Sequence, residues 1–159
     1  MVVGVLSGKT EKTMNETLNQ KQQALVAVAA CEAKDDQKTL ERILDDAFER
    51  GVLTVNEAKE TLSQLYAYTG FPRSLNALAS LQKVVAERRK ENRSVEVGCD
   101  ASPLPDDYDA LKQGAVVQTR MSGKPFDYAF APAVDYYLKA HLFGDIFARD
   151  VLTYSERRL

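Results

Sequence analysis

The stretch Leu53–Leu78, LTVNEAKETLSQLYAYTGFPRSLNAL, contains start and stop signals for two successive helices. Thr54 and Glu57 form a capping box, in which the threonine hydroxyl and the glutamate carboxylate each accept a hydrogen bond from a backbone amide at the helix start. Apolar residues then recur at helical spacing until Gly70, which ends the helix. Pro72 fits the first turn of a following helix, where its missing N–H removes no helical hydrogen bond. The stretch therefore predicts two helices joined by a short break, which favours antiparallel packing.

Further helices are predicted on both sides of this pair. The helix before it has an apolar stripe at the spacing of a core-facing helix, formed by Leu40, Ile43, Leu44, Ala47 and Phe48. Either Asp35 or Asp36 can cap its start, and Gly51 can supply the left-handed residue that ends it. A still earlier helix covers about residues 19–33, and the helix that contains Pro72 extends to about residue 91.

The segment after these helices has no sustained apolar period. Glycine and proline punctuate it at Gly98, Pro103, Pro105, Gly114, Gly123 and Pro125. We therefore expect a helical domain over residues 15–92, an extended linker or wrapping arm over residues 93–127, and a C-terminal helical segment over residues 128–159. The last segment presents Val134, Leu138, His141 and Leu142 on one face, and Gly144 interrupts or ends its helix. The predicted fold class is all-α, an antiparallel helical bundle with a long irregular linker.

Composition limits the partners and the compartment. The 159-residue chain has a formal net charge of −2, and its basic residues form no cluster beyond Arg88, Arg89 and Lys90, which fit the C-terminal end of a helix. We therefore expect no nucleic-acid partner. The apolar start of the chain is too short for a signal peptide, and no segment approaches a membrane span. Two cysteines far apart, Cys31 and Cys99, suit a reducing compartment, so the predicted location is cytoplasmic.

No motif indicates a cofactor or a metal. Gly4–Thr10, GVLSGKT, has three residues between its glycines where a phosphate-binding loop has four. His141 is the only histidine, so a two-histidine metal site or a serine–histidine relay confined to one chain would lack its parts. Tyr66, Tyr68 and His141 are candidates for lining a ligand pocket, although aromatic residues at helical spacing more often belong to a core.

The portion YTGFPRSLNAL, Tyr68–Leu78, is the most specific part of a resemblance to the carboxymuconolactone decarboxylase family, which includes the alkylhydroperoxidase D-like proteins. Leu138–Leu159, LKAHLFGDIFARDVLTYSERRL, is similar to the opening of the second half in members that carry this unit twice. The resemblance implies the family's all-α bundle, assembly into homo-oligomers such as trimers or hexamers, and a truncated second unit at the C-terminus. It also implies lactone decarboxylase or alkylhydroperoxidase (peroxiredoxin) activity.

The resemblance also implies where the chemistry would lie, on the first two helices: a glutamate, followed either by a Cys-x-x-Cys pair and a histidine or by a histidine without the cysteines. Alignment on Leu25 and Gly51 places Ala24, Asp36, Thr39 and Ile43 at those positions, and Arg158 at the glutamate position of the partial second unit. Of the first four, only Asp36 could transfer a proton. The leading hypothesis is therefore a non-catalytic or degenerate scaffold or binding unit that oligomerises and can accept a small organic ligand.

Two catalytic alternatives remain open. In the first, Asp36 acts on a small organic acid or lactone, with Tyr66 or with His141 of a neighbouring subunit. A carboxylate is a weak base at neutral pH unless burial raises its pKa, so this alternative requires an enclosed Asp36. In the second, Cys31 and Cys99 carry out peroxidase-type thiol chemistry. Cys31 falls on the alanine-rich side of its helix, where a buried and inert thiol is favoured.

Overall fold

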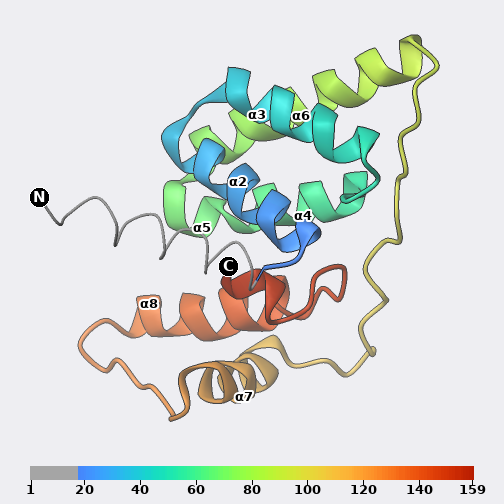
Figure 1. The fold of residues 1–159 in the computed structure, drawn as a ribbon. Coiled ribbons are helices and arrows are strands. Elements are labelled where there is room, and N and C mark those ends of the chain that lie inside the picture. Colours follow the sequence, from blue (N-terminus) through green and yellow to red (C-terminus); the bar gives the residue numbers. More distant parts are fainter. Residues whose placement is uncertain (1–17) are drawn as a thin grey trace, which may run out of the picture. The chain divides into compact units, whose positions relative to one another are not determined.

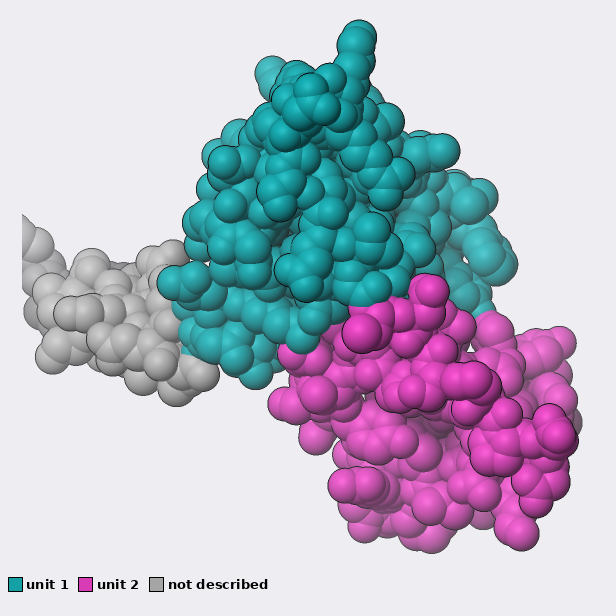
Figure 2. Space-filling view, turned by 90° about the vertical axis from the view of Figure 1, so that its right-hand side faces the viewer, with its two compact units in different colours: residues 1–98, 159 teal, residues 99–158 magenta. Residues whose placement is uncertain are grey.

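The computed structural model describes residues 18–159, and these form helices and no strands. The all-α fold class is therefore confirmed for this part of the chain. The glycine-containing segment Gly4–Thr10 and the first residues of the predicted domain, 15–17, lie outside the described residues. The chain divides into two compact units, one extending to Gly98 and the other covering Cys99–Arg158 (Figure 2). The first unit thus extends beyond the predicted limit at residue 92.

Within residues 18–98, the first unit is a bundle of four longer helices and one short helix (Figure 1). These are α2 (Gln20–Lys34), α3 (Gln37–Glu49), α4 (Val55–Gln64), α5 (Tyr66–Thr69) and α6 (Phe71–Lys90). Their core includes residues with no exposed surface, namely Val28, Leu40, Leu44, Ala47, Ala58, Leu62 and Ala77. Burying a valine or leucine side chain stabilises a fold by about 1.5–3 kcal/mol, so the apolar stripes that predict these helices also hold them together.

The capping box at the start of α4 is present as predicted. The Glu57 amide donates to Thr54 Oγ1 over 3.2 Å, and the Thr54 amide donates to Glu57 Oε2 over 2.9 Å. Gly51 and Gly70 have φ values of 63° and 87°, in the left-handed region that glycine tolerates. The prediction of one continuous helix from Thr54 to Gly70 is wrong, because α4 ends at Gln64 and the separate helix α5 covers Tyr66–Thr69, but Gly70 does end this second part.

A later segment of the chain completes the same helix start. The first two amides of α4 donate to the carbonyls of Glu96 and Val97 over 3.0 and 2.9 Å. Gly98 has a φ of 79°, and a Cβ on it would overlap the Thr54 side chain, lying 2.7 Å from the threonine Cβ. Residues 96–98, the α4 strap, therefore satisfy helix-end amides that α4 cannot satisfy itself.

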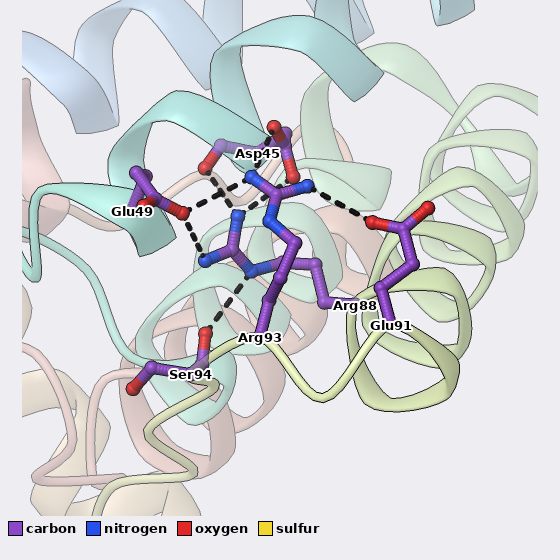
Figure 3. A network of polar contacts seen from close by, with 6 residues as sticks. All are labelled: Asp45, Glu49, Arg88, Glu91, Arg93 and Ser94. Carbon is purple, nitrogen blue, oxygen red and sulfur yellow. Dashed lines mark hydrogen bonds and ion pairs between the residues drawn. The ribbon is translucent and has the colours of Figure 1, made fainter.

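A buried arginine joins the ends of α3 and α6 (Figure 3). The Arg88 side chain is 1% exposed, and its Nη1 and Nη2 atoms donate to Asp45 Oδ1 and Glu49 Oε2, each over 2.7 Å. Its Nε atom donates to the Ser94 carbonyl over 3.0 Å. Arg93 Nη2 lies 3.0 Å from both carboxylates. Arg88 is thus a central part of the packing, where the sequence predicted only a charge complementing the helix end.

The two arginines lower the pKa values of the carboxylates in this network. Burial raises the pKa of Asp45, but hydrogen bonds from Arg88 and Arg93 outweigh it, so its pKa lies below the usual value. The same two hydrogen bonds lower the pKa of Glu49. Both carboxylates therefore remain ionised and balance the buried guanidinium.

The second unit contains a helix that the sequence analysis did not predict. Within the predicted linker, α7 occupies Ala110–Ser122, while residues 93–109 contain no helix. Its N-cap is Asp109, whose side chain accepts a hydrogen bond from the Lys112 amide over 3.0 Å. The prediction of a wholly irregular segment is wrong here because Gly114 was interpreted as a helix breaker, whereas it is a buried residue at a helix contact.

α7 packs against a π-helix in the same unit (Figure 1). The short helix α8 (Pro132–Tyr136) is followed directly by the π-helix η1 (Tyr137–Ile146), and a 3₁₀ turn, η2 (Glu156–Arg158), lies near the end of the chain. Gly144 lies inside η1, so the prediction that it interrupts the helix is wrong. A Cβ on Gly114 would overlap the Lys139 carbonyl oxygen, and one on Gly144 would overlap the Ala110 carbonyl oxygen. Two glycines therefore bring the two backbones into direct contact.

Candidate functional site

The first unit contains a fully buried carboxyl group, that of Glu32 in the last turn of α2. Glu32 has no exposed surface. Its Oε1 atom lies 2.6 Å from Thr69 Oγ1 at the end of α5. Its Oε2 atom is buried and has no hydrogen-bond partner among the described residues. A buried acidic group that is only half satisfied is rare, and it marks this position as the candidate site.

Helix periodicity explains why Glu32 is buried. Leu25, Val28 and Glu32 are spaced by three and four residues, so they share the face of α2 that packs into the core. The candidate residues named from the sequence, Cys31 and Asp36, lie on either side of this glutamate, which was not among them. The available signal was a charged residue at a core position of a periodic apolar stripe.

Burial dominates the acidity of this group. It raises the pKa of Glu32, and the nearby Asp35 carboxylate raises it further. The Thr69 hydroxyl and the positive charge of Arg73 act in the opposite direction, but the pKa remains above its usual value. Glu32 can therefore hold a proton at pH values where an ordinary glutamate has lost it.

Cys31 is buried beside this site, as the sequence predicted. It is a free cysteine with 7% of its surface exposed. Burial raises the pKa of its thiol, and the charge of Asp36 raises it further, which disfavours the reactive thiolate. Cys99 is exposed and belongs to the second unit. Cys31 therefore has the environment of a packing residue.

Asp36 caps the start of α3, and this role explains its low pKa. Its side chain is exposed and is the N-cap of α3, where Oδ1 accepts a hydrogen bond from the Thr39 amide over 3.1 Å. Hydrogen bonding to the side chain and then the backbone of Thr39 lowers the pKa of Asp36. A carboxylate with this exposure and acidity is a weak base at neutral pH, and it lacks the enclosure that the Asp36 enzyme hypothesis requires.

Replacing this cap gives a modest test of that role. Asp36→Ala should lower the thermal midpoint by a few degrees, because an α3 amide loses its acceptor, while Asp36→Asn should stay near wild type. Thermal unfolding followed by circular dichroism measures the midpoints of the two variants. Lys38→Ala, on the exposed side of α3, is the control. Equal midpoints for Asp36→Ala and Asp36→Asn would contradict the capping role.

The other positions aligned with the family's catalytic groups are also occupied by structural residues. Ala24 is buried in the core face of α2, and Ile43 is half-buried in α3. Thr39 lies in the first turn of α3 and supplies the amide that Asp36 caps. None of these side chains carries a thiol or an imidazole.

The three aromatic and histidine candidates divide between the two units. Tyr66 is half-buried and stacks on Phe71, with ring centroids 4.3 Å apart. Tyr68 is exposed on α5, in the turn that also carries Thr69. His141 belongs to the second unit, is exposed on η1, and its Nδ1 atom lies 2.9 Å from Asp145 Oδ2. The first unit therefore brings only the two tyrosines near Thr69.

Two comparisons with known proteins give no match. No protein-family model matches the chain, and no curated protein matches it. Within residues 18–159, no helix combines the length and the apolar character needed to cross a membrane. Residues 18–159 thus form an all-α fold, and its first unit encloses a carboxyl group.

Proposed function

We propose that the chain is a carboxymuconolactone decarboxylase-like scaffold unit that assembles with copies of itself and lacks the family's thiol and histidine chemistry. The resemblance of Tyr68–Leu78 to the family supports the assignment of the scaffold. The structural roles of Ala24, Asp36, Thr39 and Ile43 support the loss of the chemistry. Trimers and hexamers are the assemblies that the resemblance implies.

The observation that carries the proposal is an exposed apolar surface on the first unit. Tyr68, Phe71 and Leu75 are each 60% exposed. Phe71 and Leu75 are four residues apart in α6, so they lie on one face of that helix, and Tyr68 precedes them in α5. We call these three residues the α5–α6 apolar surface. Neighbouring large apolar side chains with this exposure are typical of protein interaction sites.

A second copy of the chain is the proposed partner for this surface. Closed symmetric homo-oligomers are the commonest soluble assemblies, and each copy then buries the same residues. The rings of Tyr66 and Phe71 stack within the chain, so Phe71 is already ordered before assembly. Little side-chain entropy is then lost when this part of the surface is buried.

Light scattering coupled to size-exclusion chromatography tests the assembly. The wild-type chain should elute at a multiple of the 17.7 kDa chain mass, and the double variant Phe71→Ser/Leu75→Ser should shift to the monomer mass while keeping its helical circular dichroism. Val97→Ser, which changes a 46% exposed residue elsewhere in the first unit, is the control and should keep the wild-type mass. A monomeric wild type, or a double variant with the wild-type mass, would overturn the proposal.

A further inference from the structure

We propose that Glu32 is a proton-binding site, in which the neutral carboxyl donates its proton to Thr69 Oγ1 and the Thr69 hydroxyl donates in turn to the Leu65 carbonyl. This inference concerns the inside of the first unit. It does not depend on the proposed self-assembly.

The number of available protons is the first argument. Thr69 Oγ1 lies 2.6 Å from Glu32 Oε1 and 2.9 Å from the Leu65 carbonyl oxygen. A threonine hydroxyl has one proton and can donate to only one of these oxygens. If Glu32 is ionised, one of the two short oxygen–oxygen contacts has no proton between its atoms. If Glu32 is protonated, both contacts are hydrogen bonds.

The second oxygen of the carboxyl group gives an independent argument. Glu32 Oε2 is buried, and residues 18–159 supply no hydrogen-bond partner for it. In a carboxylate this atom carries about half of the negative charge, and burying it unpaired is strongly unfavourable. In the neutral acid the same atom is an uncharged carbonyl oxygen, for which the lost hydration is much smaller. Burial accordingly raises the pKa of Glu32.

The charged groups around α2 do not neutralise an ionised Glu32. Arg73 of α6 is the cation that acts on it most, but its Nη1 atom donates to the Ala33 carbonyl over 2.9 Å and forms no ion pair with Glu32. Lys21 pairs with Glu57 of α4 at the opposite end of α2. Asp35 disfavours a second negative charge nearby. α3 contributes Asp36 and Arg42 around the adjoining Cys31, and α5 contributes no charged residue.

The sign of the resulting pH dependence follows from linkage. A carboxyl group whose pKa is raised by folding binds its proton more tightly in the folded state than in the unfolded state. Its contribution to stability is complete below the unfolded pKa of about 4.3 and is lost as the pH rises through the folded pKa. Over that interval the unfolding equilibrium constant increases by up to about tenfold per pH unit. Ionisation also leaves one of the two Thr69 contacts, to Glu32 or to the Leu65 carbonyl, without its proton.

A carbon-13 NMR titration of the carboxyl group in the full wild-type chain tests the proposal directly. The Glu32 carboxyl resonance is assigned through its own side-chain carbons, so the assignment requires no variant. We expect its midpoint above the ordinary glutamate value of about 4.3. A midpoint at or below that value would overturn the proposal.

Stability measured against pH provides the second readout. Urea unfolding measured from about pH 4.3 upward should show a decline in wild-type stability that is absent in Glu32→Gln, because the amide cannot ionise. Ala33→Gln places the same amide at the neighbouring exposed position of α2, and this control should keep the wild-type decline. A Glu32→Gln chain with the same pH dependence as wild type would count against a protonated Glu32. If Glu32→Gln fails to fold, the wild-type titration still decides the question.

Discussion

Gly114→Ala is expected to separate α7 from η1 and to unfold this helix pair in the second unit. A Cβ at this position would overlap the carbonyl oxygen of Lys139, and it would also lie 2.8 Å from the Gly144 amide nitrogen. Both are backbone atoms, so no side-chain rotation relieves the overlap. Overpacking of a core commonly destabilises by about 1–3 kcal/mol, and a clash between two backbones belongs at or above the upper end of that range.

The expected destabilisation by Gly114→Ala is opposite in sign to the effect of helix propensity, so the two effects can be distinguished. Alanine stabilises an isolated helix by about 1 kcal/mol relative to glycine, so a propensity effect alone would strengthen α7. Val116→Ala, at an exposed position of the same helix, is the matched control and should be neutral or slightly stabilising. Amide hydrogen exchange followed by mass spectrometry should show lost protection in the α7 and η1 peptides, with α2–α6 as the internal reference. Unchanged protection of the α7 peptides in Gly114→Ala would refute the proposed close contact.

Arg88→Ala should strongly destabilise the first unit. The substitution removes a buried guanidinium that bridges α3 to α6 and leaves a cavity between the helices. Breaking a buried ion pair typically costs about 3–5 kcal/mol, and we expect about 2–4 kcal/mol here because Asp45 and Glu49 are partly exposed and can be rehydrated. Urea unfolding monitored by circular dichroism measures the change.

Two variants separate the parts of this effect. Arg93→Ala removes the more exposed arginine from the same carboxylates and should lower stability much less. Arg88→Lys keeps the charge but cannot form the forked contacts to both carboxylates, so it should fall between wild type and Arg88→Ala. Equal effects of Arg88→Ala and Arg93→Ala would show that burial does not distinguish the two arginines.

The arginine network also predicts that stability falls as the pH is lowered, which is opposite in sign to the pH dependence expected from Glu32. The pKa of Asp45 is lower in the folded chain than its usual value, so its contribution is present above the unfolded pKa and is lost as the pH falls through the folded pKa. Unfolding experiments below pH 4 should therefore show a steeper loss of stability in wild type than in Arg88→Ala. If stability fell equally steeply in both chains, Arg88 would not be lowering the pKa of Asp45.

The sequence predicts the first unit well because its helix ends are encoded locally. The residues that begin or end these helices form hydrogen bonds or set backbone angles within a few residues of themselves, so their roles can be inferred without tertiary information. They are Thr54 with Glu57, Asp36, Gly51, Gly70 and Pro72. The apolar stripes of α3 and α4 likewise depend only on helical spacing, and their central residues are buried.

Two features that the sequence does not predict, the contact at Gly114 and the buried ion pairs of Arg88, depend on a distant partner. Gly114 acts as a helix breaker in isolation and as a contact residue only when Lys139 is beside it. Arg88 resembles its exposed neighbours Arg89 and Lys90 until Asp45 is placed opposite it. Glu32 required a different correction, since its burial follows from the spacing of Leu25 and Val28 in its own helix. The same spacing marks Glu32, next to Cys31, as a charged residue at a core position.

The α4 strap has a consequence for how the chain is made. The Asn56 side-chain amide donates to the Gly98 carbonyl, a partner 42 residues further along. During synthesis at about 5–20 residues per second, the start of α4 therefore leaves the ribosome about 2–8 s before the residues that complete it. For that interval the nascent bundle carries helix-end amides that only water can satisfy. The first unit can reach its final stability only after Gly98 has emerged, although its last long helix ends at Lys90.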